Sequence, residues 1–184
     1  FAGGPRSLHQ VRDRLSGFRE VVEAAGGEVV YAETSGLTVG GGREVGAAFD
    51  PSDPDRPTGL FAANDLIAIG VLNELVSRGC RVPDDRSIGG FDAIDFTATT
   101  AVPLTTIHQP AYDLGRRGAQ MLYELLGGTP LVPEESAESA DAEPAPPESL
   151  TPAAGPDDPR DQQVRFAPTL VVRESTAPPR RTAG

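Results

Sequence analysis

The first clear pattern in the chain is a set of apolar residues spaced three and four positions apart between residues 8 and 25. This spacing places them on one face of a helix, and it predicts an amphipathic helix over residues 8–25. Gly26 and Gly27 follow, and glycine just after a helix is typical of a left-handed stop. The apolar face consists of Val11, Leu15, Phe18, Val22 and Ala25.

Short apolar or β-branched runs, bounded by turn residues, predict strands. We expect strands over residues 28–32, 59–63, 87–91, 104–107 and 169–173, and Phe1 and Ala2 resemble the end of another strand. Helices are expected over residues 43–49, 64–79 and 110–127, with a glycine-rich loop over 35–42 and a loop rich in proline and aspartate over 50–57.

Residues that favour helix termini occur where these helices are predicted to begin and end. Asn64 fits an N-cap because its side-chain oxygen can accept from an unpaired backbone N–H, and Gly79 fits the stop. Pro110 fits the opening of the next helix. Strands alternate with helices, which favours an α/β fold with a doubly wound parallel sheet, helices on both faces and right-handed connections.

Two polar residues follow directly after predicted strands of this sheet. Asn64 comes after the strand over 59–63, and Asp92 comes after the strand over 87–91. In open parallel sheets, ligands bind beyond the carboxyl ends of the strands. The topology alone therefore places Asn64 and Asp92 where a ligand would be met.

Composition narrows the classes of function. The net charge is −11, and all 16 basic residues are arginine, scattered along the chain. Because nucleic-acid binding needs clustered positive charge, we expect no DNA contact from these residues. The single cysteine, Cys80, indicates a reducing compartment, and no apolar stretch is long enough to cross a membrane and no secretion signal is visible.

Two segments differ from the rest in composition. Residues 131–163 are rich in Pro, Glu, Ala, Ser and Asp and almost lack large apolar side chains, so we expect a disordered acidic and Pro-rich insert. A disordered tail is expected over residues 178–184 for the same reason.

Motifs of catalysis and of metal or cofactor binding are absent from the sequence. Gly40 to Gly42 lack a preceding strand, so a flexible turn is favoured over a phosphate loop. His9 and His108 lack a ligand pattern, and Cys80 fits a small apolar filler. We therefore expect no enzyme activity, no cofactor and no metal.

Five blocks of sequence, in order and in register, resemble the second half of the effector-binding domain of LacI/GalR transcriptional repressors. The resemblance covers about residues 1–129 and 164–177, and the acidic stretch between them departs from the family. The blocks are R-L-S-G-F from Arg14, A-A-N-D-L-I-A-I-G from Ala62, V-P-D-D-R-S-I-G-G-F-D from Val82, P-L-T-T-I-H-Q-P from Pro103 and L-V-V-R-E-S-T from Leu170.

The resemblance implies ligand contacts for Arg14, Asn64 and Asp92, which occupy family contact positions. Carboxylate, amide and guanidinium groups together suit a polyol. Leu37 occupies the position of an aromatic residue that stacks on the ligand in the family, so stacking is weakened here. Alternatives stay open: Asn64 as an N-cap alone, Asp92 as a turn residue, Arg14 as a surface residue. Asp65 is expected to be a first-turn acid that interacts with the helix dipole.

The resemblance also implies an architecture. Residues 1–130 would form the C-terminal subdomain of a type I periplasmic-binding-protein-like fold, and residues 164–177 would return to it as a final strand. The helix over 110–127 would pack on an N-terminal subdomain outside this chain. Phe1, placed at a strand end without an initiating Met, suggests that the parent protein continues upstream.

The resemblance predicts a cytoplasmic, homodimeric repressor with a small-molecule effector, a sugar or sugar-like polyol. It would contact DNA only through an N-terminal helix-turn-helix that these residues lack. It would not contact a membrane. A periplasmic sugar-binding component of a transporter is the first alternative, because it has the same fold. An enzyme of doubly wound fold is the second.

Overall fold

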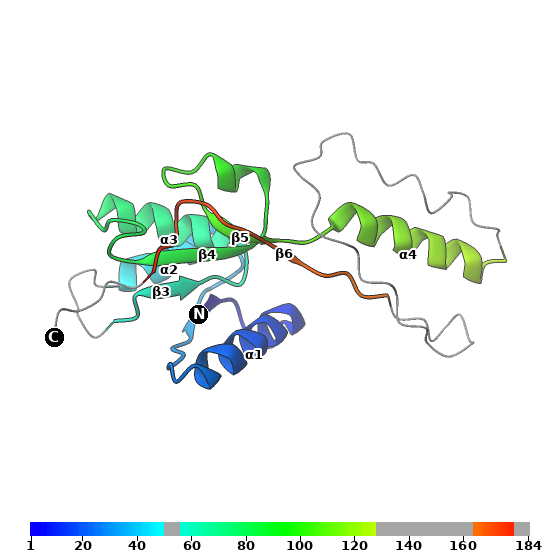
Figure 1. Cartoon of the computed structure of the whole chain (residues 1–184), viewed down its shortest axis with the longest axis horizontal. Coiled ribbons are helices and arrows are strands. Elements are labelled where there is room, and N and C mark those ends of the chain that lie inside the picture. The colour runs from blue at the N-terminus through cyan, green and yellow to red at the C-terminus, as the bar shows by residue number, and fades with distance from the viewer. Residues whose placement is uncertain (50–55, 128–163, 179–184) are drawn as a thin grey trace. The chain divides into compact units, whose positions relative to one another are not determined.

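The computed structural model describes residues 1–49, 56–127 and 164–178, and strands and helices alternate along them (Figure 1). The described residues fall into two units, one of residues 1–49, 56–108 and 170–178 and one of residues 109–127 and 164–169. The elements are β1 (Ala2–Gly3), α1 (His9–Ala24), β2 (Ala32–Glu33), α2 (Val39–Ala48), β3 (Gly59–Phe61), α3 (Asp65–Ser77), β4 (Ser87–Asp92), the 3-10 helix η1 (Asp95–Ala98), β5 (Thr105–His108), α4 (Ala111–Leu125) and β6 (Thr169–Val171).

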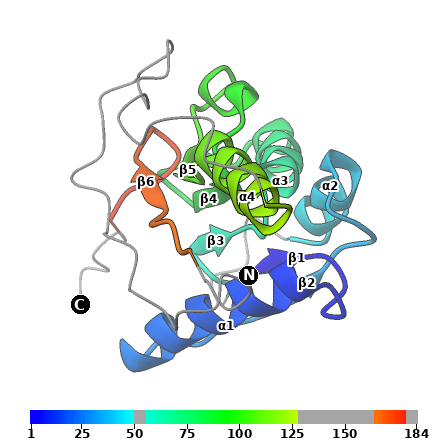
Figure 2. The same ribbon diagram turned by 90° about the vertical axis from the view of Figure 1, so that its right-hand side faces the viewer.

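Parallel strands form the centre of the first unit. β3, β4 and β5 pair in parallel, with β6 beyond β5, and β1 pairs in parallel with β2. A parallel bridge between Ala2 and Ala62 joins the two groups of strands. Helix α1 lies on one face of the strands, and α2 and α3 lie on the other (Figures 1 and 2). The α/β fold with helices on both faces of a parallel sheet is therefore confirmed.

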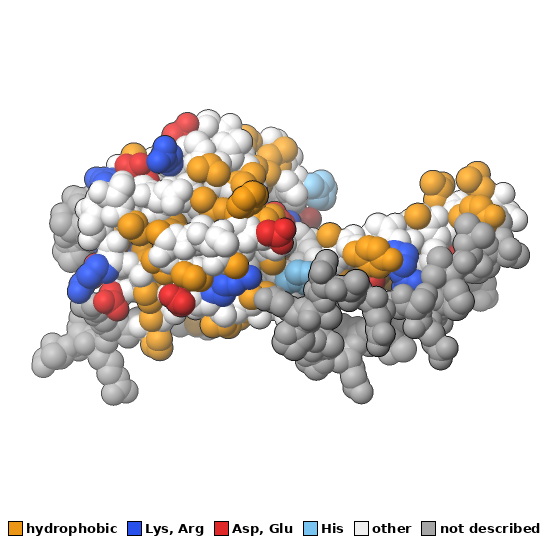
Figure 3. Space-filling view, turned by 90° about the horizontal axis from the view of Figure 1, so that it is seen from above, with side chains coloured by type: hydrophobic (Ala, Val, Ile, Leu, Met, Phe, Trp, Pro, Cys, Tyr) orange, Lys and Arg blue, Asp and Glu red, His pale blue; other side chains and the backbone are white. Residues whose placement is uncertain are grey.

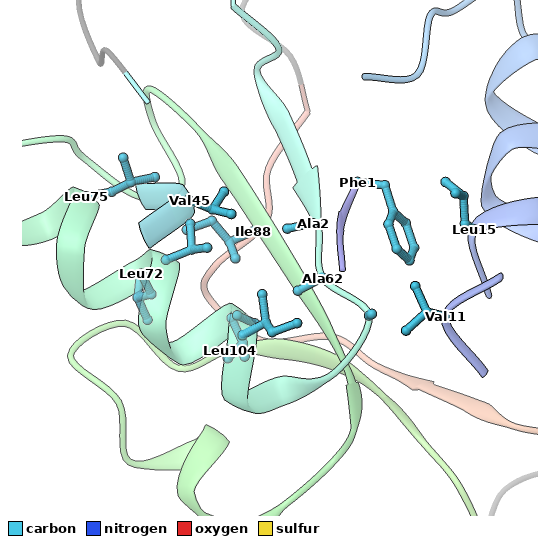
Figure 4. Close-up of a cluster of buried hydrophobic side chains, with 14 of the residues drawn as sticks. Phe1, Ala2, Val11, Leu15, Val45, Ala62, Leu72, Leu75, Ile88 and Leu104 are labelled. Atoms are coloured by element: carbon cyan, nitrogen blue, oxygen red, sulfur yellow. The ribbon is translucent and has the colours of Figure 1, made fainter. Parts of the chain in front are cut away.

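The core has a part on each face of the strands (Figure 4). On the α3 face, Ile67, Leu72 and Leu75 are at most 1% exposed. On the α1 face, Phe1 contacts the rings of Phe18 and Phe61, with centroids 5.7 and 6.0 Å apart. Burial of large apolar side chains at about 1.5–3 kcal/mol each is the main stabilising contribution here.

Helix α2 begins at Val39, so the predicted glycine-rich loop over 35–42 is wrong in its second half. The Thr38 side chain accepts from the backbone N–H of Gly41 and caps the helix. A Cβ at Gly42 would overlap the carbonyl oxygen of Ile67 in α3, and one at Gly70 would overlap that of Val39. The glycines thus allow the backbones of α2 and α3 to approach closely. This tertiary packing explains why the segment is helical although glycine has a low helix propensity.

The other predicted elements agree with the structure to within a few residues, except one strand. The strand expected over 28–32 is displaced to Ala32–Glu33, because only there does the chain pair with β1. Gly26, Gly79 and Gly127, each just after a helix, have positive φ. The expected disordered insert over 131–163 lies outside the described residues, as does the expected tail apart from Pro178.

Helix α4 in the second unit differs from α3 in burial. None of its residues is buried, and Tyr112, Leu122 and Leu125 are each at least half exposed. Figure 3 shows hydrophobic side chains on the surface of this helix, at the right of the view. The packing of α4 on another subdomain stays a prediction.

The close approach of α2 and α3 predicts opposite effects for two glycine substitutions in one helix. Gly42→Ala should lower the free energy of unfolding by about 1–3 kcal/mol, because its methyl group overlaps Ile67. Gly40→Ala is the matched control, because the nearest atom to its Cβ is 3.7 Å away. It should stabilise α2 by about 0.5–1 kcal/mol. Urea unfolding measures both, and equal effects would contradict the packing argument.

The exposure of α4 predicts fast amide exchange in the isolated chain. A single helix of this length is marginal in water without a packed face. Amides of residues 112–126 should exchange much faster than those of α3, which is built into the core. Protection across 112–126 as strong as in α3, measured by hydrogen exchange, would contradict this expectation.

Candidate functional site

The register of the sheet brings Asn64 and Asp92 to the same edge. Phe61 of β3 pairs with Gly89 of β4. Asn64 lies three positions after Phe61, and Asp92 lies three positions after Gly89. The N–H of Ala62 donates to the Gly89 carbonyl at 2.9 Å, which continues the ladder toward this edge. Both side chains therefore start from the carboxyl ends of adjacent parallel strands, where open sheets bind ligands.

Asn64 is the N-cap of α3, as the sequence predicts. Its side-chain oxygen accepts from the N–H of Ile67 at 3.0 Å, and its amide nitrogen donates to the Leu37 carbonyl at 3.2 Å. The cap therefore uses the oxygen, and one amide hydrogen stays available beyond the bond to Leu37. Leu37 itself is half-buried, and its side chain packs toward Gly4.

Arg14 reaches from α1 to the ends of both strands. One guanidinium nitrogen lies 3.2 Å from the carboxylate oxygen of Asp92, and another donates to the Ala63 carbonyl. The guanidinium also lies over the ring of Phe91, 3.7 Å from its centroid. The Arg14 side chain is only 16% exposed. The alternative of a free surface residue therefore does not fit Arg14.

Asp92 itself has an unusual backbone. Its φ is 115°, and that of Ala93 is 55°, values that residues with a Cβ rarely adopt. Such conformations cost about 1–3 kcal/mol each and concentrate at binding sites. Asp92 thus lies at a strained turn, and its contact with a ligand stays a prediction.

Asp65 has a larger role than the sequence indicates. It is 1% exposed, its carboxylate accepts from the Thr106 hydroxyl at 2.6 Å, and it accepts from the N–H of Ile94 at 3.0 Å. The expectation of a first-turn acid is correct in position but omits the burial. The available signal was the apolar run that follows it, since a helix that is apolar all round is buried.

Burial raises the pKa of the Asp65 carboxyl above its ordinary value of 3.8, and the charge of Asp92 adds to the increase. Hydrogen bonds from Thr106 and from the backbone of Ile94 and Ala93 oppose it. These hydrogen bonds favour the charged form of Asp65 and offset part of the cost of desolvation.

The structure thus brings the predicted residues together around one edge of the sheet. Arg14 and Asp92 are in direct contact, Arg14 contacts the residue before Asn64, and Asn64 contacts the backbone of Leu37. A carboxylate that accepts, a guanidinium fork that donates and an amide suit a ligand with several hydroxyl groups. Direct ligand contact by these four residues stays a prediction.

His9 and Cys80 of the described residues lie on an exposed helix face and in the core, respectively. Among the described residues, no group of three His, Cys, Asp or Glu side chains is placed to hold a metal ion. His9 bonds to Arg12 and Asp13 on an exposed face, and Cys80 is buried, which raises the pKa of its thiol. In the part of the chain that the structure describes, no helix has the length and apolarity to span a membrane.

A hollow of about 590 Å³ lies elsewhere, over the strands of the first unit. Phe18, Phe61 and Leu170 are among its mainly apolar lining residues. None of Arg14, Asn64 and Asp92 lines it. The hollow is therefore separate from the polar site at the carboxyl ends of the strands.

Comparison with known proteins defines the class to which this fold and site belong. A family model described as a periplasmic binding protein-like domain matches residues 1–143. The match covers more than half of the chain, which therefore belongs to the periplasmic binding protein-like domain family.

The relatives place the chain more narrowly. The ribose operon repressor of Bacillus subtilis is 34% identical over 129 residues, which make up 70% of this chain and 39% of that protein. The HTH-type transcriptional repressor PurR of Photobacterium profundum is 36% identical over 118 residues, 61% of this chain and 34% of that protein. These matches confirm the resemblance to LacI/GalR effector domains, and the relatives are transcriptional regulators.

A solved structure gives the same result for the fold. The complex of the transcriptional regulator CelR with cellobiose superimposes with a TM-score of 0.68 and 25% identity, over 95% of this chain and 45% of that one. This chain thus spans less than half the length of each of these three proteins.

The raised pKa of Asp65 predicts a pH dependence of stability. The folded-state pKa exceeds the unfolded one, so the folded protein binds more protons between the two values. The contribution of Asp65 to the free energy of unfolding therefore increases as the pH falls through the folded-state pKa toward 3.8, and it is lost as the pH rises.

Asp65→Asn, which does not titrate, isolates this contribution. The stability of the wild type relative to this variant should increase as the pH is lowered, in urea unfolding followed at several pH values. A relative stability that decreases with falling pH would reverse the sign and contradict the assignment.

Proposed function

We propose that this chain is the effector-binding part of a DNA-binding transcriptional repressor and that its effector is a sugar or a sugar-like small molecule. The observation that carries the proposal is the contact between Arg14 and Asp92 beside Asn64, at the carboxyl ends of two parallel strands. Two further facts support it: the relatives are repressors, and CelR, with the same fold, forms a complex with cellobiose.

The chemistry of the three polar groups explains a preference for hydroxyl-rich ligands. The Asp92 carboxylate accepts from two adjacent hydroxyls, the Arg14 guanidinium donates to ring or hydroxyl oxygens, and the Asn64 amide has one hydrogen to donate. Without ligand, Arg14 and Asp92 hold each other in position. Leu37 offers an aliphatic contact where the family has a stacking aromatic. This loop would therefore recognise an apolar face of the ligand through its shape and van der Waals contact.

The rest of the repressor lies outside these residues. With a net charge of −11 and no lysine, this chain is unsuited to phosphate contacts, so DNA binding is assigned to an N-terminal segment outside it. We assign residues 1–130 and 164–177 to one subdomain, with the face of α4 covered by the other. The parent protein is proposed to be a cytoplasmic homodimer, by analogy with repressors of this type.

Ligand binding would control DNA binding through the relative orientation of two subdomains. A ligand shifts such an equilibrium only by the difference between its affinities for the two orientations. Arg14, Asn64 and Asp92 all belong to one wall of the site, so the difference must come from contacts that the opposite wall adds in one orientation only.

A sugar-binding component of a transporter is the alternative with the same fold. Its ligand chemistry would be similar, but its relatives would be transport proteins, whereas the relatives reported above are repressors. DNA binding by the full-length protein, weakened or strengthened by a sugar, separates the two. A protein that binds a sugar and no DNA would favour the transporter component.

A panel of mono- and disaccharides, screened by thermal shift on the full-length protein, tests the site. A sugar that stabilises the wild type should bind Asp92→Ala about 10- to 100-fold more weakly in calorimetric titration, because hydrogen bonds to a charged group are lost. Asp13→Ala is the matched control, since Asp13 is a 64%-exposed carboxylate that neighbours Arg14 in sequence.

Asp13→Ala should leave the affinity unchanged. Equal affinity of wild type and Asp92→Ala for the stabilising sugar would remove Asp92 from the site.

A further inference from the structure

The end of β4 has a conformation that needs support. Asp92 and the following Ala93 both have positive φ, at 115° and 55°. Neither residue is glycine, so each conformation is disfavoured in an isolated chain. A neighbouring group must therefore hold this turn, and its identity matters because the turn determines where the Asp92 carboxylate lies.

Asp65 supplies that support from the first turn of α3. One carboxylate oxygen accepts from the N–H of Ile94 at 3.0 Å, directly after the two strained residues. The other accepts from the Thr106 hydroxyl at 2.6 Å, and the oxygen of that hydroxyl accepts from the N–H of Ala93 at 3.3 Å. One buried side chain thus connects α3, the turn after β4 and the neighbouring strand β5.

Gly90 shows how closely β4 approaches this carboxylate. A Cβ at Gly90 would overlap a carboxylate oxygen of Asp65, and its next neighbours would be side-chain atoms of Leu104 and Ala68. Gly90 pairs with Thr106 in the sheet, so the glycine and the hydroxyl lie side by side. The space under Asp65 is therefore provided by a residue without a side chain, two positions before Asp92.

The geometry of Asp92 on the other side of the turn completes the argument. Its carboxylate lies 3.2 Å from the guanidinium of Arg14, which is itself fixed by the Ala63 carbonyl and the Phe91 ring. A rotation of the turn would move the Asp92 carboxylate away from a partner that cannot follow. The contact between Asp92 and Arg14 thus depends on the backbone that Asp65 holds.

We propose that Asp65 is a positioning residue, whose carboxylate holds the turn from Asp92 to Ile94 so that the Asp92 carboxylate faces Arg14 and the effector. The part of this statement that concerns the effector rests on the proposed function. The part that concerns the turn does not, and it can be tested without ligand.

The test compares Asp65→Asn with the wild type in the full-length protein by NMR. The asparagine side chain keeps the size of aspartate but presents one uncharged oxygen and one NH2 group in place of two carboxylate oxygens. When its oxygen accepts from Ile94, its NH2 group faces the Thr106 hydroxyl, and in either orientation the charge of the acceptor is lost. The amide of Ile94 should lose about 10-fold of its exchange protection relative to that of Leu72 in α3, as expected when a charged acceptor is replaced by a neutral one. The ring-current shift that Phe91 imposes on the Arg14 side chain should also change.

Ser175→Ala is the matched control, because Ser175 bonds to the amino ends of β4 and β5 and not to the turn after Asp92. The Ser175 hydroxyl is fully buried, accepts from the N–H of Thr105 at 2.8 Å and donates to the Ile88 carbonyl. This variant should lower global stability while leaving the Arg14 ring-current shift and the Ile94-to-Leu72 ratio unchanged. If Asp65→Asn behaves in the same way as Ser175→Ala, Asp65 is only structural and the proposal is wrong.

Thr106→Val is a second variant in case Asp65→Asn does not fold. It removes the donor to Asp65 and the acceptor for Ala93 at nearly constant volume, and it should change the same two readouts in the same direction. Unchanged readouts in Thr106→Val would also overturn the proposal. If both readouts change but the protein binds no sugar, the role of Asp65 in holding the turn is supported. Only the proposed function is then contradicted.

Discussion

The parallel pairing of β3 with β4 is the constraint on which the site depends. Because both strands run in the same direction and Phe61 pairs with Gly89, residues three positions further along each strand reach the same edge. Asn64 and Asp92 are those residues. A shift of the register by one residue would turn every side chain of a strand to the opposite face, and it would also separate these two groups. The core under α3, with Ile67 and Leu72 fully buried, stabilises the pairing and so the site.

The two ends of the strands are built differently. At the amino ends of β4 and β5, the C-terminal segment is bonded to both strands: Ser175 connects Ile88 with Thr105, and Arg173 donates to the Leu104 carbonyl and to Thr97. These bonds are buried or partly buried. At the carboxyl ends, a strained turn, one buried carboxylate and one ion pair hold Asp92. The site therefore lies at the end of the sheet where a few polar interactions determine the geometry, which is also where a ligand can change it.

Much of this could be predicted from the sequence, because the relevant signals are local. The apolar spacing of α1, the N-cap at Asn64 and the alternation of strands and helices each involve a few neighbouring residues, and all are confirmed. The placement of Asn64 and Asp92 beyond strand ends followed from topology alone. What could not be predicted depends on contacts between distant segments. The glycines of α2 form a helix because α3 approaches them closely, and Asp65 is buried because the turn after β4 and the strand β5 enclose it.

The arrangement around Arg14 explains why residues so far apart in the chain can act as one binding surface. The guanidinium contacts the end of β3 through Ala63, the end of β4 through Asp92 and an aromatic face through Phe91. Three contacts on a planar group leave few orientations. A flexible arginine loses side-chain entropy when it binds a ligand, but Arg14 has already lost it in the free protein. Since the pair is partly exposed, water screens it and its own contribution to stability is small. Its value for binding is therefore preorganisation: Arg14 and Asp92 keep each other directed toward the same edge of the sheet, and a ligand with hydroxyl groups finds donor and acceptor in place.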